Sequence, residues 1–212
     1  MTAIYLELTP KKVIAWSLEW PGWCRIRPNE NAAIQALIDT EPRYRRITER
    51  AGLEFTPGDL VVVERLQGDS NTAWGVPSVL APAETSPIDA ATAQRNVALL
   101  RAAWDMLEEV VATSPAELRK GPRGGGRDRD EVRQHVIEAE RTYARKIGVR
   151  HKPFAMSDNL ALTAMRDEIA SVLSQPSTGE PLVPGGWNAS YAVRRIAWHV
   201  VDHIWEIEDR RG

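Results

Sequence analysis

Hydrophobic residues follow two different periods along the chain. Before residue 75, short runs rich in β-branched and aromatic side chains are bounded by proline, glycine or charged residues, a pattern typical of strands. These runs cover residues 4–8, 13–18, 23–26 and 60–66. After residue 89, apolar residues recur every three or four positions, which predicts amphipathic helices. The pattern therefore predicts an α+β protein with a β-rich first part and a helical second part.

The β-rich part also contains a helical segment. Asn29 is placed to cap a helix whose apolar positions continue to Ile47, and Pro42 divides or kinks that run. We expect residues 72–75 to pair beside the fourth strand. The sequence thus predicts a small α/β unit over residues 1–76.

A proline-containing connection and four helical patterns follow this unit. Pro77, Pro82 and Pro87 favour an extended connection over residues 77–88. The helical patterns, which begin near capping residues, cover residues 89–111, 128–147, 157–175 and 189–209. In the third helix, the expected buried residues are Leu160, Ala164, Ile169 and Leu173. Four helices of this length over residues 89–212 predict an up-down four-helix bundle.

Composition and charge exclude several classes of protein. Lys+Arg 27 against Asp+Glu 29 gives a net charge of −2, and the two signs balance on both sides of residue 80. Neither part therefore has the positive charge of a nucleic-acid-binding protein, and no nucleic-acid partner is expected. Cys24 is the only cysteine, so an internal disulfide and a Cys-x-x-Cys site are excluded. Because no apolar run is long enough for a membrane span or signal peptide, we expect no membrane partner and a cytoplasmic protein.

Three of the four histidines form the candidate site. His199 and His203 lie four residues apart and so project from one face of the last predicted helix, in register with its apolar stripe. His135 lies on the core-facing stripe of its own helix. Three inward imidazoles on two helices can converge on a divalent ion and leave a fourth position for water or substrate, the pattern of a catalytic metal site. Alternatively, backbone carbonyls or the carboxylates of Glu140 and Glu206 satisfy three buried histidines.

Other side chains on or near these helices have simpler interpretations. His151 lies in a polar segment and is expected at the surface. Trp198 and Trp205, seven residues apart on the histidine helix, indicate core packing or the face of a homodimer. Trp187, just before that helix, is expected at the rim of a pocket.

The two helices that carry the histidines resemble those of a known family. Residues 131–143, in which His135 precedes an acidic and aromatic segment, and residues 195–203, with the motif His-x-x-x-His, are similar to the DinB/YfiT-like metal-binding four-helix bundles. The resemblance extends over about residues 86–210 and includes the order of the helices. It implies that His135, His199 and His203 hold Zn²⁺ or Ni²⁺. One of Glu138, Glu140 and Glu206 is expected to orient an imidazole.

The same resemblance implies a metal-dependent enzyme that acts on a small-molecule substrate. Members of this family in some bacteria use a low-molecular-weight thiol such as mycothiol, bacillithiol or glutathione, so a thiol S-transferase is the first hypothesis. A metal-dependent hydrolase is a second, because bound water on zinc can reach a pKa near 7. A non-catalytic binding or regulatory module with a structural metal is a third.

The first unit resembles a different family. Its order of two strands, Pro21-Gly22, a third strand and an Ala-rich helix after Asn29 is similar to the HicB-like antitoxin fold. This resemblance implies only the shape of the unit, because no DNA-binding segment or toxin-binding partner motif accompanies it. We expect the unit to dock on the bundle, since its connection is short and Trp16, Trp20 and Trp23 provide more aromatic area than about seventy residues bury alone.

Overall fold

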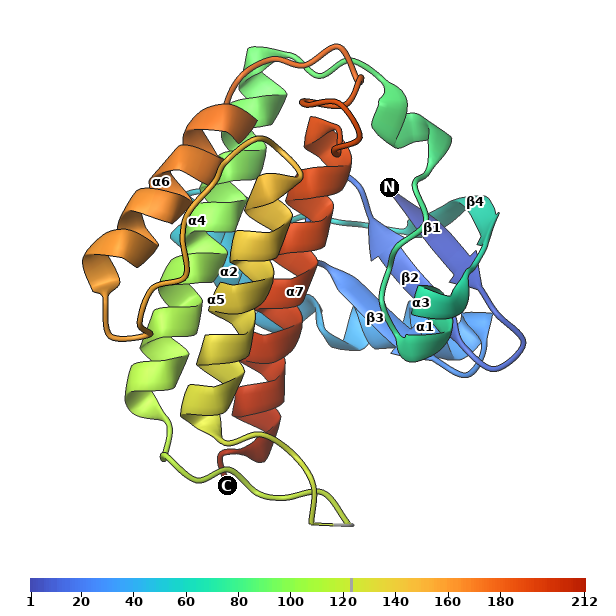
Figure 1. Cartoon of the computed structure of the whole chain (residues 1–212). Coiled ribbons are helices and arrows are strands. Elements are labelled where there is room, and N and C mark those ends of the chain that lie inside the picture. The colour runs from blue at the N-terminus through green and yellow to red at the C-terminus, as the bar shows by residue number, and fades with distance from the viewer. Residues whose placement is uncertain (123) are drawn as a thin grey trace.

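The computed structural model describes residues 1–122 and 124–212, and it is an α+β protein in which a small sheet unit lies beside a group of long helices (Figure 1). The sheet has the order β3-β2-β1-β4, with β4 parallel to β1 and the other neighbours antiparallel. The elements of the first unit are β1 (Thr2–Leu8), β2 (Val13–Ser17), β3 (Cys24–Arg27), α1 (Glu30–Asp39), α2 (Glu41–Arg50), β4 (Leu60–Gln67) and α3 (Ser70–Trp74).

Local sequence explains the first unit, with one correction. Pro42 divides the predicted helix into α1 and α2 and lies in the first turn of α2, where a missing N–H is tolerated. The predicted pairing of residues 72–75 beside β4 is wrong, because this segment belongs to α3. The Asp69 carboxylate accepts the N–H of Thr72, and Gly75 ends the helix in a left-handed conformation.

Four long helices form the second part, as predicted. They are α4 (Ala90–Thr113), α5 (Arg129–Arg145), α6 (Asn159–Leu173) and α7 (Ala189–Arg210). Their directions do not alternate strictly, because α5 and α6 both run opposite to α4 and α7 (Figure 1). The guanidinium of Arg133, near the start of α5, donates to the Met156 carbonyl just before α6, so these two helices start at the same end. Residues 146–158 return along the bundle instead of forming a short turn, and the expected up-down alternation is wrong at this point.

The buried face of α6 also differs from the expectation. Ile169 and Leu173 are buried, but Leu160 is 86% exposed and Ala164 is exposed. The side chains that α6 buries instead include Leu162, Met165 and Arg166. Arg166 is on this face because it donates to the fully buried Glu140 carboxylate of α5. The buried face of α6 therefore includes a charged residue, and hydrophobicity alone did not predict it.

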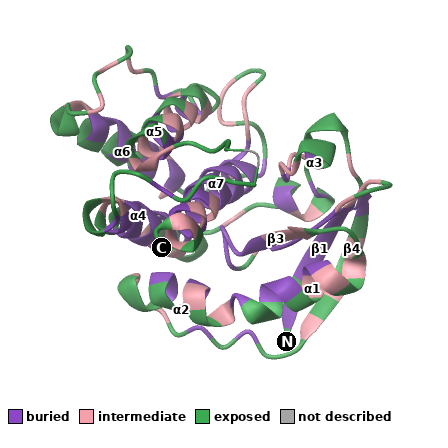
Figure 2. Cartoon of the chain, turned by 90° about the horizontal axis from the view of Figure 1, so that it is seen from below, coloured by how far each residue is buried: buried purple, intermediate pink, exposed green. Residues whose placement is uncertain are grey.

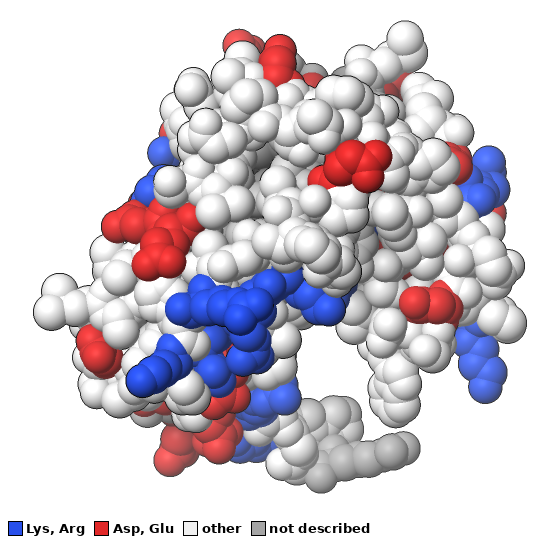
Figure 3. Space-filling view, turned by 45° about the horizontal axis from the view of Figure 1, so that its top comes forward, with Lys and Arg blue, Asp and Glu red and all other residues white. Residues whose placement is uncertain are grey.

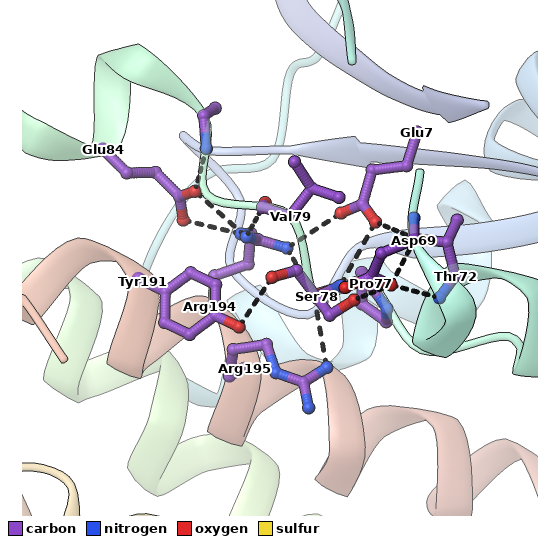
Figure 4. A network of polar contacts seen from close by, with 11 residues as sticks. Glu7, Asp69, Thr72, Pro77, Ser78, Val79, Glu84, Tyr191, Arg194 and Arg195 are labelled. Carbon is purple, nitrogen blue, oxygen red and sulfur yellow. Dashed lines mark hydrogen bonds and ion pairs between the residues drawn. The ribbon is translucent and has the colours of Figure 1, made fainter. Parts of the chain in front are cut away.

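The segment between the two parts is not a simple linker. It contains a 3₁₀ turn, η1 (Pro82–Thr85), which buries the carboxylate of Glu84. Arg194 of α7 donates to both oxygens of Glu84, at 2.6 and 3.0 Å, and to the carbonyl of Pro77. Its Nη1 lies 3.6 Å from a carboxylate oxygen of Glu7 in β1 (Figure 4). This network ties the sheet, the connecting segment and α7 together.

One continuous hydrophobic core spans both parts of the chain. Trp20, Trp23, Tyr44 and Phe55 form an aromatic cluster that packs with side chains of α4 and α7. Buried residues run along most of α7 and along β1 (Figure 2). At Gly22, where φ is +95°, an added Cβ would lie 2.9 Å from Val201 Cγ2 of α7. The α/β unit is therefore packed closely against the helix that carries two of the histidines.

Across residues 1–122 and 124–212, no helix has the length and hydropathy that crossing a membrane requires.

Candidate metal centre

The structure brings the three predicted histidines together. His135 comes from α5, and His199 and His203 come from consecutive turns of α7, which packs against α5. The three side chains form a group in which each residue offers one nitrogen and all these nitrogens lie within 4.8 Å of one another. The two helices thus place the three imidazoles as the sequence pattern predicts.

The distances in the triad suit a divalent ion. His199 Nε2 lies 3.2 Å from His135 Nε2 and 3.2 Å from His203 Nε2. Bonds of about 2.0–2.1 Å from zinc to imidazole place two ligand nitrogens of a tetrahedral site about 3.3 Å apart. A single ion of this kind would therefore contact all three nitrogens with small movements of the rings.

Hydrogen bonds within the triad cannot satisfy the same nitrogens. His203 Nδ1 lies 2.7 Å from a Glu206 carboxylate oxygen and donates to it, so the tautomer with its proton on Nδ1 presents the lone pair of Nε2 to His199. If His199 Nε2 carries a proton, it donates to one neighbour and cannot accept from the other. If it carries a lone pair, it faces the lone pair of His203. A cation at the centre satisfies all three nitrogens at once.

Protonation of the triad is disfavoured by its surroundings. Burial lowers the pKa of His199 well below 6.5, and the neighbouring imidazoles of His203 and His135 lower it further. Burial and then His203 also lower the pKa of His135. Both rings are therefore neutral near pH 7, the state in which imidazole binds metals.

Glu206 is the carboxylate that orients an imidazole, and the other two candidates do not. Its Oε2 accepts from His203 and its Oε1 lies 2.6 Å from Nη1 of Arg210, and the hydrogen bond from His203 is the main cause that lowers the pKa of Glu206. Glu138 instead accepts from a neighbouring glutamine on α5, and Glu140 accepts from Trp104 and from Arg166. Nδ1 of His199 is buried without a hydrogen-bond partner among the described residues.

Arg210 extends this chain of contacts to the segment before α5. Its Nε donates to the carbonyl of Arg119 and its Nη2 donates to the carbonyl of Arg127. Through Arg210, Glu206 therefore links His203 to two backbone carbonyls that precede α5 in the chain.

Two aromatic rings pack against the His199 side of the triad. The rings of Tyr143 and Trp198 lie 5.7 and 5.8 Å from the His199 ring. Trp187 packs on Tyr143 and lines a cavity of about 290 Å³ with Tyr191, so its predicted place at a pocket rim is confirmed. His135 is half-buried, and the triad is thus not enclosed on its α5 side.

Two interpretations of other side chains need revision. Trp198 and Trp205 are 8% and 2% exposed, which confirms core packing and contradicts a dimer face built from them. His151 is not freely solvated, because its side chain is 17% exposed and its Nε2 lies 3.1 Å from a carboxylate oxygen of Glu168. The sequence analysis also missed Arg195, which lies one turn before His199 and is 6% exposed. Its spacing of four residues from His199 is the signal that could have identified it.

Comparison of the chain with models of protein families, with curated proteins and with solved structures finds no match. The function must therefore be inferred from the triad and its surroundings.

Proposed function

We propose that this chain is a divalent-metal-dependent enzyme that transfers a low-molecular-weight thiol to a small electrophilic substrate. In this proposal, His135, His199 and His203 hold Zn²⁺ or Ni²⁺. The observation that carries it is the convergence of three Nε2 atoms whose hydrogen-bonding needs the triad cannot meet by itself.

The number and exposure of the ligands favour a catalytic site over a structural one. Structural zinc sites are closed by four protein ligands, whereas catalytic sites use three and keep one position open. The described residues offer three histidine ligands, and His135 is half-buried. When bound, the ion would supply an electrophilic position that holds an incoming thiol as thiolate near neutral pH. A non-catalytic module would need neither an accessible ligand nor an open position.

The carboxylates near the triad favour thiol transfer over hydrolysis. Metallohydrolases commonly place a carboxylate beside the metal as general base. Glu206 contacts the triad, but His203 and Arg210 occupy one oxygen each, so it orients His203 and is not free to take a proton from water. A nucleophile that arrives as an anion needs no such base. The similarity of the two histidine helices to the DinB/YfiT-like bundles supports the same choice.

The reacting sulfur must come from a ligand and not from the chain. Cys24 is buried in β3, and burial raises the pKa of its thiol. A buried, protonated thiol is a poor nucleophile. Mycothiol, bacillithiol and glutathione are the candidate sources.

The test begins with metal content and continues with thiol binding. The full chain, purified without a histidine tag, should contain about one divalent ion by elemental analysis, and His199→Ala and His203→Ala should lose it. His151→Ala is the matched control and should keep the ion. In Co²⁺-substituted protein, one of the three thiols should produce charge-transfer absorption that requires His135, persists in Cys24→Ser, and strengthens with pH until the thiol is deprotonated.

One result would contradict the metal site, and another would contradict the thiol transfer alone. A protein that contains no metal and keeps its stability in chelator has no metal site. A metal-loaded protein whose spectrum none of the three thiols changes is not a thiol transferase, and activation of water would then be the better account.

A further inference from the structure

Two consecutive arginines of α7 are buried in very different ways. Arg194 is 1% exposed and its charge is fully compensated: its Nε and Nη2 donate to the two oxygens of Glu84. This side-on pairing uses the edge of the guanidinium that presents two parallel N–H groups to a carboxylate. Glu7 lies 3.6 Å from Nη1 on the other side. Arg194 therefore shows how this fold stabilises a buried guanidinium.

Arg195 is 6% exposed and has no carboxylate partner among the described residues. Its Nη1 donates to the carbonyl of Pro77 at 3.2 Å, and its Nε is buried with no partner. Nη2 also lacks a hydrogen bond to the described residues. In Figure 4 the guanidinium of Arg195 lies apart from Glu84 and Glu7, and one terminal nitrogen points away from the network. The edge that Arg194 uses for a carboxylate is thus unpaired in Arg195.

An unpaired buried guanidinium is destabilising, because it has lost water without gaining a counter-charge. The rings of Trp198 and Tyr143 lie 5.0 and 5.6 Å from its Cζ and offset part of this loss by cation–π interaction. They supply no acceptor for Nε. The Arg195 guanidinium thus has no counter-charge among the described side chains, and an anionic ligand would supply one.

Arg195 lies next to the histidine triad. Trp198 and Tyr143, which pack against its guanidinium, are the same rings that pack against His199. Arg195 and His199 are separated by one helical turn, or about 6 Å along the axis of α7. On the face seen in Figure 3, Lys and Arg side chains gather in one group with Asp and Glu side chains beside it. The unpaired guanidinium therefore lies close enough to the triad for one small anionic molecule to reach both.

We propose that Arg195 binds the carboxylate of the substrate through its Nε and Nη2 atoms, in the way that Arg194 binds Glu84. The substrate class is then a small carboxylic acid whose reactive group lies about one helical turn from its carboxylate, at the triad. This assignment of the reactive group rests on the proposed metal-dependent function, whereas the carboxylate site itself does not. A carboxylate is favoured over a phosphate because the free edge of the guanidinium offers two N–H groups and one positive charge. A carboxylate matches it with two oxygens and one negative charge.

The test measures binding of benzoate and of its uncharged match, benzamide, to the full chain by calorimetry, with and without Zn²⁺. Benzoate should bind more tightly than benzamide. Arg195→Gln should weaken the affinity for benzoate at least about tenfold, because hydrogen bonds between charged groups are lost. It should leave the affinity for benzamide unchanged. Arg195→Lys should give intermediate affinity, because it keeps the charge and loses the fork. Arg101→Gln, which removes a surface arginine paired with Asp167, is the matched control and should bind like the unmodified chain.

A second measurement reports on Arg195 directly. In ¹⁵N-labelled protein, the Nε–H resonance that is missing from Arg195→Lys should shift when benzoate is added. If Arg195→Gln does not fold, this resonance and the Arg195→Lys affinity decide the question. Equal affinities for benzoate and benzamide, or a benzoate affinity that neither substitution changes, would overturn the proposal.

Metal uptake, measured by equilibrium dialysis of the same samples, separates the two proposals. Benzoate binding that depends on Arg195 in a chain that takes up no Zn²⁺ supports the carboxylate site and contradicts the metal-dependent function. Zn²⁺ uptake without Arg195-dependent benzoate binding overturns the carboxylate site and leaves the metal proposal standing.

Discussion

Replacing Glu206 by Gln should weaken the affinity of the triad for Zn²⁺ by about tenfold to a hundredfold. The substitution preserves the shape of the side chain and removes its charge. His203 Nδ1 and Arg210 Nη1, which lie 2.7 and 2.6 Å from the two Glu206 oxygens, lose a carboxylate acceptor. With a neutral acceptor in place of the carboxylate, the His203 ring is held less firmly in the orientation that points its Nε2 at the triad.

The expected range corresponds to about 1.4–2.7 kcal/mol of binding free energy. Glutamine keeps one acceptor oxygen, so the loss is the difference between a hydrogen bond to a charged group, about 1.5–3 kcal/mol, and one to a neutral group, about 0.5–1.5 kcal/mol. The Glu206 side chain is 28% exposed, and solvent screening moves the expectation toward its lower end. The same substitution also weakens the hold of Arg210 on the carbonyls of Arg119 and Arg127.

The assay is competition for Zn²⁺ between the protein and a chromophoric chelator at fixed pH. Glu208→Gln is the matched control, because Glu208 lies two residues away on α7 and pairs with Arg43 and Arg46 of α2 instead of the triad. It should leave the Zn²⁺ affinity unchanged. If Glu206→Gln binds Zn²⁺ as tightly as the unmodified chain, Glu206 does not support the site.

Three further outcomes are expected. In metal-free protein, the lowered pKa of His199 means that the unfolded chain binds more protons below pH 6.5, so the free energy of unfolding should fall as pH decreases from there, and urea titrations of His199→Gln should show a weaker dependence. Gly22→Ala should lower the free energy of unfolding by about 2 kcal/mol or more, because the residue has a positive φ and its new Cβ would clash with Val201. Gly52→Ala is the control: its φ is also positive but its Cβ has open space, so it measures the backbone strain alone. Residues 1–80 expressed alone should lose cooperative structure by circular dichroism, because the core of this unit continues into α4 and α7; a cooperatively folded fragment with no affinity for the bundle would contradict this.

The triad could be predicted because its geometry is set locally. The spacing of His199 and His203 fixes their common face once α7 is helical, and the apolar stripe of α5 fixes the face of His135. The remaining step, that α5 and α7 are neighbours, follows from bundles in general. The caps of α4 and α6 are local in the same way, because Asp89 and Asp158 each accept a backbone N–H three residues further along the chain.

Features that depend on distant pairs of polar residues could not be predicted. Arg166 occupies the buried face of α6 because Glu140 on α5 is buried opposite it, and neither residue signals the other in the sequence. The same holds for Arg194 and Glu84, which are 110 positions apart. The direction of α6 depends on the path of residues 146–158, which hydrophobic periodicity does not describe. These misses arose where tertiary contacts decided the structure, whereas the miss at residues 72–75 overlooked a local cap at Asp69.

Helix α7 carries both the locally determined histidine pair and Arg194, which forms a long-range ion pair. Successive residues of a helix point about 100° apart, so Arg194 reaches Glu84 and the sheet while the Arg195 guanidinium packs on the rings of Tyr143 and Trp198. The contacts of Arg194 with Glu84 and of Gly22 with Val201 hold α7 from the side opposite α5. Metal and substrate sites need their side chains held within fractions of an ångström, which rigid, buried helices provide. The α/β unit therefore fixes the helix that carries His199, His203 and Arg195 without contributing a side chain to the triad.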